Sequence, residues 1–123
     1  MGVFEIFFFR YDKGDCTILN SLDSLPPKIE AKARVRIERL AEFGNKLKRP
    51  EADFLRDGIY EIRFRDVKIQ YRILYFFLGQ NAIILSSLIT KEQEVQRKEI
   101  DRCIANKKLV ESNFELYTYI SEV

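Results

Sequence analysis

Three arginines stand inside the most strand-like stretch of the sequence. Residues 57–77 read DGIYEIRFRDVKIQYRILYFF and place Arg63, Arg65 and Arg72 among apolar residues. A guanidinium group is always charged, and its planar fork can donate two parallel hydrogen bonds to a phosphate or a carboxylate. Because arginine is rarely buried without a partner, these residues are the first candidates for chemistry, and that chemistry is the gripping of an anion.

Alternation along two predicted strands places the arginines on one face. In residues 59–65 and 69–77, apolar side chains alternate with polar ones. If the two strands pair through a loop with an even number of residues, their apolar faces match and Arg72 shares a face with Arg63. We therefore expect a cationic patch on the open face of a sheet whose other face is covered by helices. Replacement of an exposed Arg72 by alanine should then change stability by roughly 0.5 kcal/mol or less.

A second interpretation of the same residues is structural. Arg63 and Arg72 could pair with Glu61 or Asp66 and only keep the face hydrated. The spacing alone gives this interpretation about the same weight as the binding of an anion.

Further basic residues flank these strands. The net charge is only +2, but residues 28–50 and 63–72 are both rich in lysine and arginine. Such clusters are compatible with a polyanionic partner. In residues 28–39 acidic residues are interleaved, so there we favour an ordinary solvated helix face.

The chain contains no histidine. This excludes Ser–His and Cys–His catalytic pairs and imidazole metal ligands. Its two cysteines, Cys16 and Cys103, are far apart in the sequence and are expected to be buried thiols of a reducing compartment. A zinc site is not expected. We see neither a signal peptide nor a membrane-spanning stretch, so a cytoplasmic location with no membrane partner is the default.

The order of predicted elements indicates a single α+β domain over residues 1–123. An N-terminal strand and two helices should pack on one face of an antiparallel sheet, followed by a C-terminal helix. The second helix starts at Pro26 or Pro27 and ends at Gly44. The expected elements are strands 3–10, 59–65, 69–77 and 82–89, helices 16–24, 26–43 and 91–108 with Thr90 as N-cap, a loop at 44–58, and an acidic tail from about 109.

Beyond these patterns, several motifs resemble one known family. The stretches SLPPKIEAKARVRIERLAEFG, LRDGIYEIRFRDVKIQYRILYFF and AIILSSLITKEQEVQRKEIDRCI resemble the HigB-like branch of the RelE/ParE toxin superfamily. Its members are the toxins of bacterial and phage type II toxin–antitoxin pairs. The resemblance covers nearly the whole chain.

The resemblance implies a RelE/ParE-like fold and a metal-independent endoribonuclease that needs no cofactor and cleaves mRNA, usually on the ribosome. It implies that Arg63, Arg72 and Lys91 face the RNA as catalytic residues, with Arg72 at the scissile phosphate. We expect the other basic residues near these strands to bind RNA: Arg65, Lys68, Lys46, Lys48 and Arg49.

Those residue types suit metal-free cleavage. When the 2′-OH attacks the adjacent phosphate, negative charge builds on the phosphoryl oxygens, and fixed cations lower the barrier. Family members often carry a histidine near the position of Ser87 and a proline near Gln96, and this chain has neither. The general base is therefore left open among Lys91, a nearby tyrosine and a ribosomal group.

The resemblance also implies partners. They are a helix-turn-helix antitoxin, mRNA and the ribosome, with promoter DNA bound only through the antitoxin complex. Two other functions are compatible with the same fold: a non-enzymatic toxin of the ParE type that poisons gyrase, and a catalytically decayed member that only binds its antitoxin.

Overall fold

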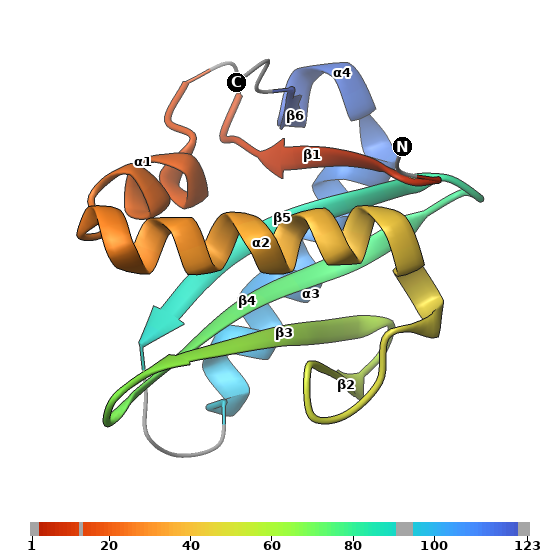
Figure 1. The fold of residues 1–123 in the computed structure, drawn as a ribbon. Helices are drawn as coiled ribbons and strands as arrows, with labels where there is room; N and C mark the ends of the chain where they lie inside the picture. Colours follow the sequence, from red (N-terminus) through yellow and green to blue (C-terminus); the bar gives the residue numbers. More distant parts are fainter. Residues whose placement is uncertain (1–2, 13, 91–94, 121–123) are drawn as a thin grey trace.

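One six-stranded sheet forms the centre of the protein (Figure 1). The computed structural model describes residues 3–12, 14–90 and 95–120. Along the sheet the strands are ordered β2-β3-β4-β5-β1-β6. In chain order the elements are β1 (Glu5–Phe9), α1 (Thr17–Asp23), α2 (Pro27–Phe43), the 3₁₀ helix η1 (Gly44–Lys46), β2 (Ala52–Arg56), β3 (Ile59–Asp66), β4 (Ile69–Leu78), β5 (Ala82–Thr90), α3 (Arg97–Ser112), α4 (Phe114–Tyr117) and β6 (Thr118–Tyr119).

The sheet is mixed, so the expectation of a purely antiparallel sheet is wrong. Strands β2 to β5 do form an antiparallel meander, because short turns connect them. Strand β1 instead lies parallel to β5, with Glu5 opposite Ala82 and Phe8 opposite Leu85. No short turn links β1 to β5, and β6 closes the far edge of β1 in the antiparallel direction.

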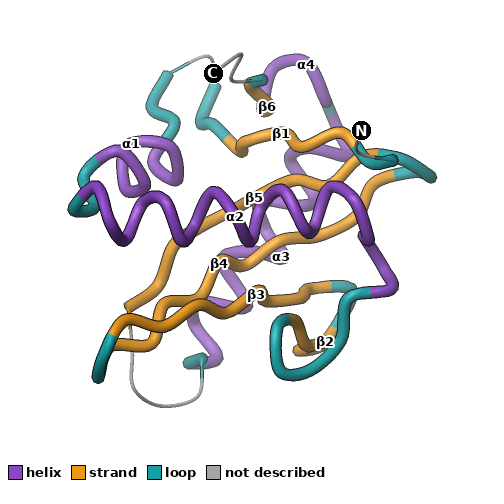
Figure 2. The backbone as a smooth tube through the Cα atoms, viewed as in Figure 1, coloured by secondary structure: helices purple, strands orange, loops and turns teal. Residues whose placement is uncertain are grey.

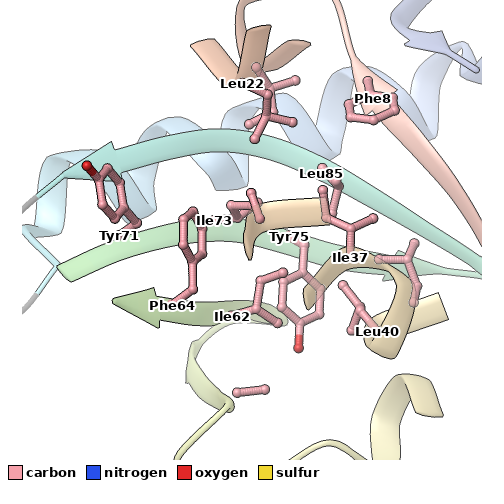
Figure 3. Close-up of a cluster of buried hydrophobic side chains, with 14 of the residues drawn as sticks. Phe8, Leu22, Ile37, Leu40, Ile62, Phe64, Tyr71, Ile73, Tyr75 and Leu85 are labelled. Carbon is pink, nitrogen blue, oxygen red and sulfur yellow. The ribbon is translucent and has the colours of Figure 1, made fainter. Parts of the chain in front are cut away.

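Helices α1 and α2 cover one face of the sheet, as expected (Figure 2). The predicted stripe of α2 is buried: Ile29, Ala33, Ile37 and Leu40. Figure 3 shows Ile37 and Leu40 of this stripe gathered with side chains of β3 and β4, among them Ile62 and Tyr75. Gly44 ends the helix at φ +52°, and a Cβ there would lie 2.1 Å from the Phe4 ring, so both its backbone and its surroundings require glycine.

The other face of the sheet is not open, contrary to expectation. Helix α3 lies behind it (Figure 1), and the two form a second apolar core. Buried residues of this core are Phe7, Phe9, Ile59, Leu74, Phe76, Ile84, Ile89, Cys103 and Val110. As expected, Cys103 is a buried thiol, and burial raises its pKa to about 11, whereas Cys16 is only partly buried.

Several elements differ from expectation, and most of the other boundaries differ by only one or two residues. Strand β2 lies within the segment predicted as a loop, because it pairs with β3. The described part of the C-terminal helix begins at Arg97 with Gln96 as its N-cap, and its expected start at residue 91 lies outside the described residues. Thr90 is the last residue of β5 and does not cap that helix. The acidic segment from about residue 109 forms the end of α3 and then α4 and β6. No helix among the described residues has the length and apolarity needed to cross a membrane.

Candidate anion-binding site

The register of the meander brings four charged residues onto one face. Strands β3 and β4 are joined by a two-residue turn. Arg63 and Arg72 share a face, as the parity argument predicts, and the register places them directly opposite each other. Asp53 of β2 lies opposite Glu61 of β3. Because residues 61 and 63 share a face of β3, all four side chains belong to the same face of three neighbouring strands.

Glu61 joins the two arginines. Its side chain is only 1% exposed. One carboxylate oxygen accepts from Arg63 Nε at 2.8 Å, and both accept from Arg72 Nη1 at 2.8 and 2.9 Å. The pairing of Arg63 and Arg72 with Glu61 that the structural interpretation predicts is therefore present. Asp66 instead pairs with Lys32 at 3.1 Å.

The network continues outward through Asp53. Its Oδ2 accepts from Arg63 Nη2 at 3.1 Å and from Arg49 Nε at 3.0 Å. The hydrogen bond from Arg49 lowers the pKa of Asp53, and burial opposes this only in part. We call the five residues Arg49, Asp53, Arg63, Glu61 and Arg72 the ladder. Its three guanidiniums and two carboxylates carry a net charge of +1.

The ladder lines a cleft of about 480 Å³ together with Leu55, Val95 and Ile100. The exposed fraction of the arginine side chains falls along the ladder, from 76% for Arg49 to 27% for Arg63 and 13% for Arg72. The expectation that Arg72 lies exposed on an open face is wrong. Its guanidinium is hydrogen-bonded to the buried Glu61 and lies beside the second core. Its Nε is buried without a hydrogen-bond partner among the described residues.

This arrangement can bind an anion at a defined place. Hydrogen bonds to the carboxylates use Nε and Nη2 of Arg63 and Nη1 of Arg72. Within the described chain, Arg63 Nη1 and Arg72 Nη2 are left uncommitted. Guanidiniums held on strands by a buried carboxylate are more rigid than groups on loops, which favours electrostatic stabilisation of a phosphate.

The remaining predicted site residues lie elsewhere or outside the described residues. Lys46, Lys48, Arg65 and Lys68 are exposed and do not line the cleft. Arg65 and Lys68 border a shallow hollow beside the β3–β4 turn. Lys91 lies outside the described residues.

Sequence reasoning missed Asp53 and treated Glu61 only as a possible partner. Asp53 was hidden because residues 44–58 were predicted to be a loop, so no face could be assigned to it. A signal was present in ADFLR, a short run that begins two residues after Pro50 and mixes apolar residues with the charged Asp53 and Arg56.

Fold and site together define a small α+β protein with an arginine-lined cleft. The model of one family, described as phage-derived protein Gp49-like (DUF891), matches residues 20–108 of the 123. The chain therefore belongs to this Gp49-like family, a toxin-like family of the RelE/ParE type. The matched residues include the whole ladder and leave out β1, α4 and β6. The comparison with curated proteins found no match.

Proposed function

We propose that the protein is the toxin of a type II toxin–antitoxin system and acts as a metal-independent, HigB-like endoribonuclease on mRNA at the ribosome. One observation carries the proposal. Arg63 and Arg72 lie opposite each other on adjacent strands, share the buried Glu61, and line a cleft. Membership of a toxin-like family supports the toxin part of the proposal.

In the proposed reaction the RNA supplies its own nucleophile. A 2′-OH attacks the adjacent phosphorus and gives its proton to a general base. The bond from phosphorus to the 5′ oxygen breaks, and that oxygen takes up a proton. The products carry a 2′,3′-cyclic phosphate and a 5′-OH. Arg63 and Arg72 stabilise the negative charge that develops on the phosphoryl oxygens.

Other residues have proposed parts in the same function. Lys91 would contact the scissile phosphate, and the general base stays open among Lys91, a tyrosine and a ribosomal group. The RNA backbone outside the cleft would be bound by four exposed basic residues: Lys46, Lys48, Arg65 and Lys68. A helix-turn-helix antitoxin would bind the toxin, and the pair would bind its promoter DNA.

One observation favours a second candidate function. Each arginine of the ladder pairs with at least one carboxylate, and Arg72 is largely buried. This is also the arrangement expected of a structural ion-pair network. The second candidate is therefore a member that binds its antitoxin and does not cleave RNA.

Expression in bacteria separates the two candidates. We expect the chain, expressed alone, to arrest growth and translation within one doubling, and co-expression of the adjacent helix-turn-helix gene to restore both. Growth curves and incorporation of labelled amino acids measure the effect. A member that only binds its antitoxin would accumulate as folded protein while growth continued at the rate of the empty-vector control.

A further inference from the structure

The outer carboxylate of the ladder lies where an oxygen of a phosphate would lie. Asp53 Oδ2 accepts hydrogen bonds from Arg49 Nε at 3.0 Å and Arg63 Nη2 at 3.1 Å, and Arg49 Nη2 lies 2.9 Å from it in an ion pair. Two guanidinium groups thus converge on a single anionic oxygen at the mouth of the cleft. Arginine forks bind carboxylate and phosphate oxygens with the same geometry.

Asp53 differs from Glu61 in how firmly it is held. Its side chain is 21% exposed, against 1% for Glu61, and its strongest partner, Arg49, is 76% exposed. Exposed ion pairs are worth little, typically about 0–1 kcal/mol. Glu61 lies behind both inner arginines, where releasing it would leave a buried charge. Of the two carboxylates, only Asp53 can be displaced at low cost.

We propose that Asp53 is an internal competitor for phosphate, which limits how tightly the cleft holds a polyanion and is displaced when one binds. The inference rests on the proposed function, because it assigns a regulator to the same cleft. A phosphate oxygen and Asp53 Oδ2 need the same N–H groups of Arg49 and Arg63, so only one of them can accept at a time. Bound RNA therefore gains these contacts only by replacing Asp53.

Displacement does not require the strand to unfold. The other oxygen, Asp53 Oδ1, accepts from the backbone N–H of Phe54 at 2.9 Å. Strand β2 is an edge strand, and its register shifts between Phe54 and Arg56. Rotation of the Asp53 side chain toward solvent is enough to free the N–H groups of Arg49 and Arg63 for a phosphate.

The test is binding of a single-stranded DNA oligonucleotide, which lacks the 2′-OH and stays uncleaved. Fluorescence anisotropy at several salt concentrations gives its affinity for the parent and for Asp53→Asn. The asparagine keeps an acceptor for Phe54 N–H and loses the charge. We expect binding to be roughly fivefold tighter or more. The slope of log K against log[salt] should steepen by about 0.7, which corresponds to one more phosphate neutralised. Asp53→Ser serves as a second variant with the same expectation.

Glu51→Gln is the matched control. Glu51 is also 21% exposed and pairs with two arginines, Arg36 and Arg39, but it does not line the cleft. The substitution Glu51→Gln removes one negative charge, as Asp53→Asn does, but outside the cleft. It should therefore leave the slope of log K against log[salt] unchanged.

Arg63→Ala separates the inference from the proposed function. If Arg63→Ala weakens binding while Asp53→Asn and Asp53→Ser match the parent in affinity and slope, the competitor role is overturned and the cleft still binds phosphate. If Arg63→Ala also matches the parent, both the inference and the proposed function are overturned.

Discussion

Arg72→Ala is expected to slow mRNA cleavage by roughly 10²–10³-fold. Loss of one fixed donor aimed at developing negative charge typically has this effect on the rate. Arg72 is the innermost cation of the cleft, and the shared contact with Glu61 holds it in place. A large effect on cleavage is expected because no other cation of the ladder reaches as deep.

The same variant must be compared at a temperature where it is folded. With 13% of its side chain exposed, Arg72 contributes to stability, so the melting temperature should fall as well. Arg34→Ala is the control, because Arg34 is likewise held by ion pairs, with Asp23 and Glu30, but does not line the cleft. It should cleave at the parental rate. Parental cleavage by folded Arg72→Ala would show that Arg72 has only a structural role.

The second large effect concerns Glu61. We expect Glu61→Gln to lower the free energy of unfolding by about 3 kcal/mol, the lower end of the range for breaking a buried ion pair. The amide keeps the shape of the side chain and removes the charge that joins Arg63 to Arg72. For a chain of this size the melting temperature should fall by roughly 10 °C.

The control for this measurement is again Glu51→Gln. The Glu51 carboxylate also pairs with two arginines, but it is 21% exposed. We therefore expect the free energy of unfolding to fall by no more than about 1 kcal/mol. Thermal melting followed by circular dichroism compares the two variants directly. Equal melting temperatures for Glu61→Gln and the parent would mean that the buried carboxylate does not stabilise the ladder.

The pairing of the central arginines could be predicted from the sequence. Alternation in β3 and β4 fixes which residues share a face, and only an even-numbered turn buries both apolar faces together. This places Arg63 and Arg72 on the same face without knowledge of the rest of the fold, whereas their direct opposition depends on the length of the turn. The stripe of α2 and its end at Gly44 are equally local features.

Burial of Arg72 could not be predicted from alternation alone. Alternation separates the two faces of a strand, but it does not show what covers each face. A signal was present in β4, which is apolar on both faces from Ile73 to Leu78 and so indicates burial on both sides. The arginines mark only one end of that face, and the rest of the face is apolar.

Pairing that depends on distant segments was also beyond the sequence. Strand β1 reaches β5 across more than 70 residues, so no turn fixes their parallel direction. Strand β2 carries Asp53 and Arg56 and begins two residues after Pro50, which weakens its strand pattern. Because β2 could not be placed from the sequence, Asp53 could not be identified as the partner of Arg49 and Arg63, and the side of the cleft formed by β2 could not be predicted.

The most direct test of the central claim is the chemistry of transcript ends in cells that express the chain. Sequencing of RNA 5′ and 3′ ends after induction should reveal new cuts within translated messages. The proposed reaction predicts 5′-OH ends and 2′,3′-cyclic phosphates at these cuts, and their absence in cells that express folded Arg72→Ala. Intact messages in arrested cells, or cuts that bear 5′-phosphates, would contradict cleavage by the 2′-OH at the arginine cleft.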